Sequence, residues 1–437
     1  MTLTSELVSK LVLGAGTTLI SFVGELPQID LGDRHALVIV EDESYLPEEG
    51  YRPKARVLRV GPKDCLEAQI YPFLVVNQYR YQILVPKDLD PYRKTRLDSL
   101  LQFLRSTGIN MSTVNAFGGM FSENIIRNTP EILKASSVTP LRGTQAGRPA
   151  VLIASGPSLN QAIPALRSFK DKGVLIAADS LVSFLPAQGV DPDFFVSVDP
   201  QRATYDKQGG ATSSAALFFH PSVFHLIPRE WKGPLLTTAT HMAPYQILQL
   251  PDHGHIEEDV QCQMHLAFNL AAWMGCDPII LTGQDLCYHG DRMYAEGAQY
   301  LGAEDASKIM AGTYEKKNIR GEAVRTTIVF ESYHATFERK IRSFHGKVYN
   351  ATPGGVLIDG AENVDLDVMQ QRCENSAGFS VPKAQTPAPP PEAMGIALKQ
   401  LSFLNDCLMV SMGVLPGEEK LLNMVRAVRE TIERIEG

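Results

Sequence analysis

Three polar stretches in the middle of the chain carry the side chains best suited to chemistry. They occupy residues 155–158, 283–294 and 350–355. Each follows a short apolar run of the kind that forms a buried strand. Glycine lets a backbone turn sharply and come close to a ligand, while hydroxyl and amide groups bind phosphate oxygens. The three stretches therefore predict a site for an anionic ligand.

The first stretch lies between an apolar run at 150–154 and a helical pattern at 159–169. A strand, a tight turn and a helix in this order direct backbone N–H groups and a helix N-terminus at an anion. Gly156 permits the turn, Pro157 fixes φ without offering an N–H, and Ser158 either caps the helix or binds a phosphate oxygen. These residues are candidate phosphate ligands.

Two more apolar runs follow this unit, and each ends in an aspartate. The run at 173–178 leads to Asp179, and the run at 194–198 leads to Asp199. In an open α/β sheet, ligands bind at the carboxyl ends of the strands, so both carboxylates are candidates for ligand contacts. The same pattern also fits an ordinary α/β sheet whose loops carry capping residues.

The second and third stretches extend this edge of the sheet. A helical pattern at 264–274 and an apolar run at 278–282 lead into the second stretch, which contains Tyr288 and Tyr294. Tyrosine hydroxyls donate hydrogen bonds to phosphate oxygens without adding a charge. The third stretch suits a polar loop that folds over a ligand, and a glycine-rich turn would have the same composition.

Composition places the chain among large globular proteins. Its 437 residues are too many for one core, so two or three domains are expected. The net charge of −8 and the lack of a Lys/Arg run disfavour partners such as nucleic acid or anionic membranes. Six scattered cysteines without CxxC spacing indicate reduced thiols and a cytoplasmic protein. The apolar residues 11–24 are too few to cross a bilayer and indicate a core segment, so no membrane span is expected.

The succession of strand and helix patterns predicts an α/β protein in several parts. The expected parts are a small α/β domain at 1–110 with strands at 36–40, 55–60 and 81–85, a helical connector at 111–148, a central α/β domain at 149–380, a proline-rich linker at 381–392 and two helices at 393–437. Separate helices are expected at 93–104 and 121–134, around the connector. The helices at the end of the chain serve packing or partner binding in this interpretation.

Two further patterns suggest a metal and are better explained otherwise. His253 and His255 flank a glycine, but a metal cluster needs three or four converging ligands, so a solvated loop is expected. Asp191 and Asp193 resemble the metal-binding DxD sequence of some glycosyltransferases, but they lie directly before a strand and indicate a turn. No metal site is predicted.

Four separated sequences together resemble the motility accessory factor (Maf) family of flagellin glycosyltransferases. They are Gly156-Pro157-Ser158-Leu159, residues 192–199, Gly283-Gln284-Asp285-Leu286 and residues 350–355. The resemblance covers about residues 115–365. The same core is similar to an archaeal pterin pyrophosphokinase and, more distantly, to bacterial sialyltransferases. The resemblance implies a Rossmann-like, sialyltransferase-like central domain.

What the resemblance implies is an inverting, cytoplasmic glycosyltransferase. Its donor would be a CMP-activated nonulosonic acid of the pseudaminic or legionaminic type, and its acceptor would be Ser or Thr of flagellin, in support of flagellum assembly and motility. No further cofactor would be required. The residues expected to bind the nucleotide are Ser155, Gly156, Pro157, Ser158, Asp179, Asp199, Gly283, Gln284, Asn350, Thr352, Gly354 and Gly355.

The expected catalytic residues are Glu322, His289, Asp285, Tyr288 and Tyr294. Tyrosines that match Tyr288 and Tyr294 would stabilise the departing phosphate in place of a metal. The base histidine of the sialyltransferases has no counterpart in residues 318–326. Glu322 is therefore the nearest base by type, and His289 is its rival.

Two other functions stay open. In a pterin pyrophosphokinase, Asp179, Asp199 and Asp285 would hold Mg²⁺ and ATP. A non-catalytic flagellin-binding protein is the second alternative. The N-terminal domain and the C-terminal helices favour the glycosyltransferase, because a kinase of small metabolites does not need protein-docking parts.

Overall fold

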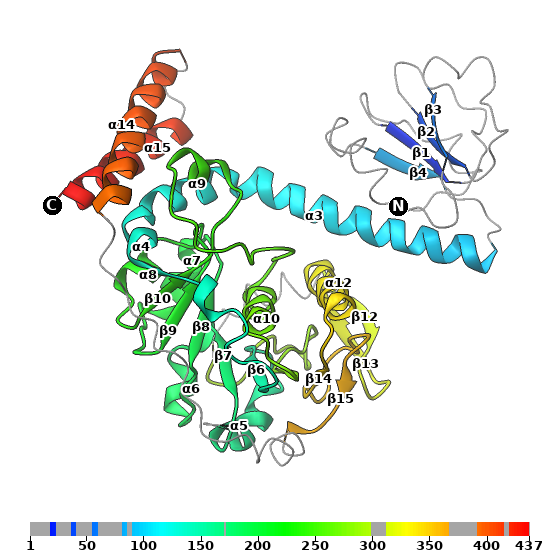
Figure 1. Ribbon diagram of the computed structural model, residues 1–437. Helices are drawn as coiled ribbons and strands as arrows, with labels where there is room; N and C mark the ends of the chain where they lie inside the picture. The colour runs from blue at the N-terminus through cyan, green and yellow to red at the C-terminus, as the bar shows by residue number, and fades with distance from the viewer. Residues whose placement is uncertain are drawn as a thin grey trace. The chain divides into compact units, whose positions relative to one another are not determined.

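The computed structural model describes residues 18–22, 36–40, 55–59, 81–84, 90–169, 172–298, 312–366, 391–414 and 419–436 (Figure 1). The chain divides into two units, Met1–Val114 and Asn115–Gly437. One long helix, α3 (Pro91–Arg127), crosses the division.

The N-terminal unit contains a four-stranded sheet in the order β3-β2-β1-β4, with all pairs parallel. The strands are β1 (Thr18–Phe22), β2 (Ala36–Val40), β3 (Ala55–Arg59) and β4 (Tyr81–Leu84). The three predicted strands are confirmed, and the apolar stretch at 11–24 supplies a fourth. Parallel strands need crossover connections, which agrees with a small α/β domain.

The helical region that follows differs from the two predicted helices. Instead of ending near 104, α3 continues without interruption to Arg127, and α4 (Thr129–Lys134) begins after Asn128. Serine, threonine and glycine at 112–119 lower helix propensity but keep their N–H groups, so the hydrogen-bond ladder continues. Pro130 interrupts it, because the proline ring removes an N–H and clashes with the preceding turn.

The larger unit is built on a nine-stranded sheet in the order β15-β14-β11-β6-β7-β8-β9-β10-β5, and every pair in it is parallel (Figure 1). Its strands are β5 (Ser136–Ser137), β6 (Ala150–Ile153), β7 (Val174–Ala178), β8 (Phe194–Ser197), β9 (Ala216–Phe219), β10 (Leu235–Thr237), β11 (Ile279–Thr282), β14 (Val348–Asn350) and β15 (Glu362–Asn363). The predicted α/β fold class is confirmed.

The central strands are apolar along their whole length because both faces of the sheet are covered. Every residue of β6, β7, β8, β9 and β11 is buried. Successive residues of a strand point to opposite faces, so Phe194 and Phe195 of β8 fill the cores on the two sides. Burial of each such side chain stabilises the fold by about 1.5–3 kcal/mol.

Helices and one hairpin complete this unit. The helices are α5 (Leu159–Arg167), α6 (Phe184–Ala187), α7 (Arg202–Gln208), α8 (Leu226–Glu230), α9 (Ala243–Ile247), α10 (Gln263–Trp273) and α12 (Ile328–Ser343), with 3₁₀ turns η1 (Thr139–Leu141) and η2 (Asp179–Leu181). Strands β12 (Tyr314–Lys317) and β13 (Ala323–Thr326) form an antiparallel hairpin that the sequence patterns did not predict.

Two helices near the end of the chain, α14 (Pro391–Val414) and α15 (Glu419–Glu436), agree with the predicted pair. Arg434 of α15 forms an ion pair with Glu131 of α4 and donates a hydrogen bond to the Arg127 carbonyl oxygen. These contacts fasten α15 to the junction of α3 and α4. The expected proline-rich linker lies outside the described residues as far as residue 390. No helix in the described part of the chain is long and apolar enough to cross a membrane.

Candidate active site at the switch point of the sheet

The sheet reverses its direction of growth at β6. From β6 the chain adds β7, β8, β9 and β10 on one side, and it then places β11 and β14 on the other side. In open parallel sheets this switch point leaves a crevice at the carboxyl ends of the diverging strands, where ligands bind. Residues 154–158 follow β6 and residues 283–289 follow β11, so the first two predicted stretches border the crevice.

Two glycines let the loops after β6 and β11 touch. A Cβ on Gly156 would lie 2.1 Å from Oδ2 of Asp285 and 2.4 Å from the carbonyl oxygen of Gly283. A Cβ on Gly283 would lie 2.2 Å from the carbonyl oxygen of Ala154, and Gly283 has a φ of +64°. The Gly156 N–H donates to the Gly283 carbonyl oxygen across the contact at 2.9 Å. Any larger side chain at either position would separate the two loops.

The Asp285 carboxylate occupies the N-terminus of α5. Oδ2 of Asp285 accepts hydrogen bonds from the hydroxyl of Ser158 at 2.8 Å and from its N–H at 3.3 Å. Ser158 is buried and makes no capping hydrogen bond to its own helix, so the capping alternative is wrong. The positive end of the α5 dipole and the Ser158 donors thus stabilise a carboxylate of the protein itself.

Asp285 also contacts His289. Oδ1 of Asp285 lies 2.9 Å from Nε2 of His289, which is an ion-pair distance, although the angle between the groups is not that of a hydrogen bond. The Asp285 side chain is 1% exposed and the His289 side chain is 23% exposed. The neighbouring carboxylate raises the pKa of His289, and burial of the ring opposes this only in part. Asp285 therefore favours the protonated imidazole.

The third predicted stretch braces this arrangement. The hydroxyl of Thr352 accepts a hydrogen bond from the Gln284 N–H at 3.3 Å. Asn350 is buried and donates from its amide to Asn363 of β15 at 3.2 Å. A Cβ on Gly354, whose φ is +87°, would lie 3.0 Å from Cε1 of His289. The loop therefore packs on the histidine and on the turn after β11.

A cavity of about 370 Å³ opens beside His289. The loop after β11, helix α5, the β12–β13 hairpin and the third stretch line it together. Its lining residues are Gln161, Tyr288, His289, Gly290, Asn318, Arg320, Glu322, Ala323, Val324, Arg325, Pro353 and Gly354. The cavity therefore brings both predicted base candidates, His289 and Glu322, to one place, together with Arg320 from the turn of the hairpin and Arg325 from β13.

Asn318 holds the turn that carries Glu322. The amide of Asn318 donates to Oε2 of Glu322 at 2.9 Å, and its oxygen accepts from the N–H groups of Arg320 and Glu322, both at 2.9 Å. Asn318 is buried, whereas Glu322 and Arg320 are exposed. The turn thus holds the Glu322 carboxylate at the cavity, which Arg320 also lines.

The two aspartates after β7 and β8 have different surroundings. Asp179 is fully buried, and its carboxylate accepts hydrogen bonds from the hydroxyl of Ser197 and from the Gln263 amide, the latter at 3.2 Å. Burial raises the pKa of Asp179 to about 6. Asp199 is partly exposed and accepts from the Thr204 hydroxyl at 2.7 Å. Asp199 is thus accessible to solvent, whereas Asp179 is enclosed by protein groups.

The two predicted tyrosines belong to the stretch that follows β11. Tyr288 is buried, and its hydroxyl lies 3.8 Å from the sulfur of Met293. Tyr294 is partly exposed, and burial together with Tyr288, Asp199 and Asp179 raises its pKa to about 12. Both tyrosines therefore stay protonated and able to donate at neutral pH.

Close to Tyr294, the carbonyl oxygen of Ser155 accepts a hydrogen bond from the Ala295 N–H at 2.9 Å. The segment that carries Tyr294 thus lies against the loop after β6. Pro157 lies in the turn between that loop and α5. The predicted residues of the first and second stretches therefore meet at the switch point, whereas Asp179 and Asn350 are buried beside it.

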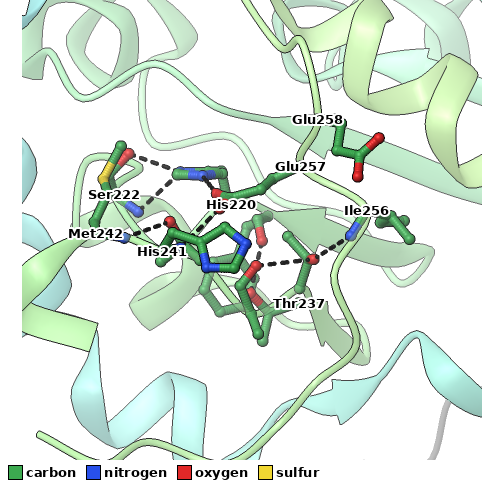
Figure 2. Close-up of polar contacts among 12 residues, drawn as sticks. His220, Ser222, Thr237, His241, Met242, Ile256, Glu257 and Glu258 are labelled. Carbon is green, nitrogen blue, oxygen red and sulfur yellow. Dashed lines mark hydrogen bonds and ion pairs between the residues drawn. The ribbon is translucent and has the colours of Figure 1, made fainter. Parts of the chain in front are cut away.

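The histidine-rich segment forms a separate, closed network (Figure 2). The His220 imidazole contacts the Ser222 hydroxyl at 2.7 Å and Oε2 of Glu257 at 2.9 Å, and Glu257 also accepts from the His241 N–H at 2.8 Å. Burial alone would raise the pKa of Glu257, but the hydrogen bond from His220 lowers it. In the described part of the chain, no three His, Cys, Asp or Glu side chains converge as metal ligands.

The expected solvated loop at 253–255 needs a correction for His253. This side chain is buried, and Nδ1 lies 2.9 Å from the Tyr245 hydroxyl. His255 is exposed and stacks on His241 with 4.7 Å between ring centroids. The contact with Tyr245 holds the ring of His253 in the core, whereas the ring of His255 is at the surface. Asp193 accepts from the Leu175 N–H at 2.8 Å, which confirms the predicted turn before β8.

Four lining residues of the cavity with polar or charged side chains were not predicted as site residues. They are Gln161, Asn318, Arg320 and Arg325. Arg320 and Arg325 flank Glu322 in the sequence, and this pair of cationic side chains is the signal that indicates the site. Cationic side chains beside a glutamate are suited to anionic substrates, because they offset negative charge on a phosphate or carboxylate group.

Comparisons with known proteins agree with the predicted resemblance. Residues 123–291 match a family model described as 6-hydroxymethylpterin diphosphokinase MptE-like. An uncharacterized protein from Treponema pallidum (strain Nichols) is 28% identical over 141 residues, which cover 32% of this chain and 66% of that relative. The structure of a Maf glycosyltransferase from Magnetospirillum magneticum AMB-1 is similar with a TM-score of 0.53 at 14% identity, over 94% of this chain and 69% of that chain.

These findings confirm the resemblance to Maf proteins and to an MptE-like core, and they establish the fold of the chain. The family model ends at residue 291, so it includes the loops after β6 and β11 but not the β12–β13 hairpin or the third stretch. The similarity to bacterial sialyltransferases stays a prediction.

Proposed function

We propose that this protein is a glycosyltransferase that moves a nonulosonic acid from a CMP-activated donor to Ser or Thr of flagellin, with inversion. The observation that carries this proposal is the switch-point cavity, in which His289 with its carboxylate partner faces two arginines and Glu322. The fold, similar to that of a Maf glycosyltransferase, supports it. A cytoplasmic location and a role in flagellum assembly and motility follow from the acceptor.

Two arginines at the cavity suit the charge of such a donor. A CMP-nonulosonate carries a phosphodiester and a sugar carboxylate, and Arg320 and Arg325 supply two guanidinium groups at the cavity. Arginine binds both kinds of oxyanion with paired N–H donors. Because Asp285 already occupies the N-terminus of α5, the phosphate would bind beside that helix and towards the arginines.

His289 is better suited to protonate the leaving group than to remove a proton from the acceptor. Its pKa is raised by Asp285, so the imidazolium form is more populated than it would be for a histidine without a carboxylate neighbour. A positioned cation at the departing phosphate stabilises the charge that develops as the glycosidic C–O bond breaks. Asp285 is a positioning residue in this scheme, because it acts through the imidazole.

Glu322 is then the general base. Its carboxylate is held by the Asn318 amide and lines the same cavity. In the proposed step, the acceptor hydroxyl transfers its proton to Glu322, its oxygen forms a bond to the anomeric carbon, and CMP leaves with a proton from His289. General acid and base groups of this kind each contribute about 100-fold to 10,000-fold in rate.

The remaining predicted residues have supporting places in this proposal. Tyr294 and Asp199 are partly exposed next to the switch point and would contact the nucleotide. Tyr288 is buried under the cavity and would act through packing or through its hydroxyl once a ligand is bound. Asp179 would orient Ser197 and Gln263 rather than the ligand.

A pterin pyrophosphokinase is the second candidate function, and the match of residues 123–291 to an MptE-like model favours it. In that case Asp179, Asp199 and Asp285 would hold Mg²⁺ and ATP. All three already accept hydrogen bonds from protein groups. Asp179 accepts from Ser197 and Gln263, Asp199 accepts from Thr204, and Asp285 accepts from Ser158. Magnesium prefers ligands that are free to complete an octahedron, so this arrangement supports the glycosyltransferase instead.

Intact-mass measurement of flagellin tests the proposal directly. The full-length protein is incubated with flagellin and CMP-pseudaminic or CMP-legionaminic acid, and the flagellin mass should rise by whole sugar units. His289→Gln and Glu322→Gln should each slow the increase about 100-fold or more. Glu433→Gln, an exposed carboxylate on α15, is the matched control and should leave the rate unchanged. Transfer of diphosphate from ATP to a pterin, with no flagellin modification, would support the second candidate.

A further inference from the structure

A second cavity of about 540 Å³ lies between α10 and α12. It is closed by residues 255–259 and by Arg142, which follows η1, and it shares no lining residue with the switch-point cavity. Its lining residues are Arg142, His255, Ile256, Glu258, Asp259, Phe268, Asn269, Ala272, Trp273, Arg339, Lys340, Ser343 and Phe344. Cationic and aromatic side chains therefore share its walls.

Lys340 is the most unusual group in this cavity, because it is a buried cation bonded to neutral atoms. The residue is 7% exposed, and its ammonium donates to the Glu258 carbonyl oxygen at 2.7 Å and to Oδ1 of Asn269 at 2.8 Å. Burial lowers the pKa of Lys340 to about 8. Buried charges are costly unless an opposite charge pairs with them, so the site lacks an anion.

The nearest carboxylates do not supply that anion. Asp259 is held by Arg339 through two hydrogen bonds of 2.9 and 2.8 Å. Glu258 is exposed, and Figure 2 shows its side chain pointing away from His220 and Glu257. Within the described residues, Lys340 forms no ion pair within 4.0 Å. An ammonium has three N–H donors, so one is available to a ligand after the two bonds to protein oxygens.

The wall around Lys340 is preorganised. The amide of Asn269 donates to the carbonyl oxygens of Ile256 at 2.7 Å and of Glu258 at 2.9 Å, which fixes the 255–259 segment against α10. A site held by hydrogen bonds needs little rearrangement when a ligand enters, so less ordering entropy is lost on binding.

The cavity is also lined by aromatic rings and by a second cation. The Arg142 guanidinium lies 5.0 Å from the centre of the Trp273 ring, and the indole N–H donates to the Val138 carbonyl oxygen at 2.8 Å. Phe268 and Phe344 meet edge to face at 5.5 Å. A planar apolar group can pack on these rings while an attached anionic group faces the cations.

We propose that the cavity between α10 and α12 binds a small organic anion, with its phosphate or carboxylate group between Lys340 and Arg142 and its planar apolar part against Trp273 and Phe344. Occupancy supplies the charge partner that Lys340 lacks. The site is independent of the proposed transfer reaction and lies on residues that take no part in it.

Isothermal titration of the full-length protein with four small probes tests this proposal. Phenyl phosphate and benzoate combine a ring with an anion, inorganic phosphate has no ring, and benzyl alcohol has no charge. At least one of the two aromatic anions should bind, and inorganic phosphate and benzyl alcohol should each bind about tenfold more weakly or not at all. Preference for phenyl phosphate would identify a phosphate ester as the ligand class, and preference for benzoate a carboxylate. Failure of both aromatic anions to bind at millimolar concentration, or equal binding of benzyl alcohol, would overturn the proposal.

Matched variants locate the binding. Arg142→Gln changes an exposed residue and should keep the fold, and Lys340→Met removes the buried cation; each should weaken binding of the aromatic anion about tenfold. Lys347→Met removes an exposed lysine outside the cavity, and Arg325→Gln alters the other cavity; both should bind as the unmodified protein does. Unchanged affinity in Arg142→Gln would contradict the assignment, whatever the stability of Lys340→Met.

Discussion

The ends of β7 and β11 carry carboxylates that look alike in sequence and differ in the structure. Asp179 follows β7 and is surrounded by neutral hydrogen-bond donors, Ser197 and Gln263. Asp285 follows the turn after β11 and contacts an ionisable ring, His289, as well as Ser158. One carboxylate is in a network of neutral groups, and the other is half of a charge pair at a cavity.

The difference shows that a position at the carboxyl edge of a sheet is not enough to make a carboxylate functional. Both side chains are buried, so neither contacts solvent. Asp285 can nevertheless influence chemistry, because its partner His289 is 23% exposed and lines the cavity. The side chains that donate hydrogen bonds to Asp179, Ser197 and Gln263, are both neutral and cannot exchange a proton at neutral pH. Burial of Asp179 instead makes the region sensitive to pH.

The largest effect is expected from Asp285→Asn. Without the carboxylate, the pKa of His289 should fall towards its ordinary value and the imidazolium should be less populated at neutral pH. Turnover should fall about 100-fold at pH 7, and the limb of the kcat profile that reports His289 should move to lower pH. The matched control is Asp359→Asn, an exposed aspartate outside both cavities. A variant with reduced turnover and an unmoved pH profile would show that Asp285 has only a structural role.

Gly156→Ala should destabilise the larger unit by about 3 kcal/mol, because the new methyl group would overlap Asp285 and the Gly283 carbonyl oxygen. Chemical denaturation measures this loss. Gly119→Ala is the control in α3, where no atom lies within 4 Å of the added carbon, and it should stabilise the helix by up to about 1 kcal/mol. Equal stabilities of the two variants would mean that the loops after β6 and β11 are not in contact.

Asp179→Asn should have a smaller effect that depends on pH. The pKa of Asp179 is raised from 3.8 to about 6, so its burial favours the protonated form. A raised acid pKa contributes stability below the ordinary pKa, and that contribution is lost as pH rises through about 6. The asparagine variant should match the unmodified protein near pH 4 and exceed it by about 1–2 kcal/mol at pH 7.5. Thermal unfolding at both pH values measures this, and a constant difference would contradict the assigned pKa.

The central sheet could be predicted because parallel strands covered on both faces leave continuous apolar runs. Those runs located β6, β7, β8 and β11 within a residue or two. The β12–β13 hairpin left no such signal, because its residues Tyr314–Lys317 are mostly exposed and polar. The full length of α3 was not predicted, because the serine, threonine and glycine at 112–119 lower helix propensity and suggested an end that the helix does not have.

The site was predicted in part. Residues that follow β6 and β11 were identified as a ligand-binding edge, and His289 and Glu322 were named as rivals. Their common cavity depends on a hairpin that was not predicted. The contact of Ser158 with Asp285 joins residues that are 127 positions apart, and only the strand order brings them together. The residue types therefore predicted the ligand-binding edge of the sheet. The pairing of Asp285 with Ser158 could be recognised only once the order of the strands was known.

Calorimetric titration of CMP tests the assignment of the switch-point cavity most directly. CMP should bind the full-length protein in EDTA, and ATP with Mg²⁺ should bind much more weakly, because tyrosines, arginines and His289 would replace a metal at the phosphate. Arg325→Gln should weaken CMP binding about tenfold, whereas Arg142→Gln in the other cavity should leave it unchanged. Tight binding of ATP with Mg²⁺ and no measurable affinity for CMP would contradict the proposed function and favour the pyrophosphokinase.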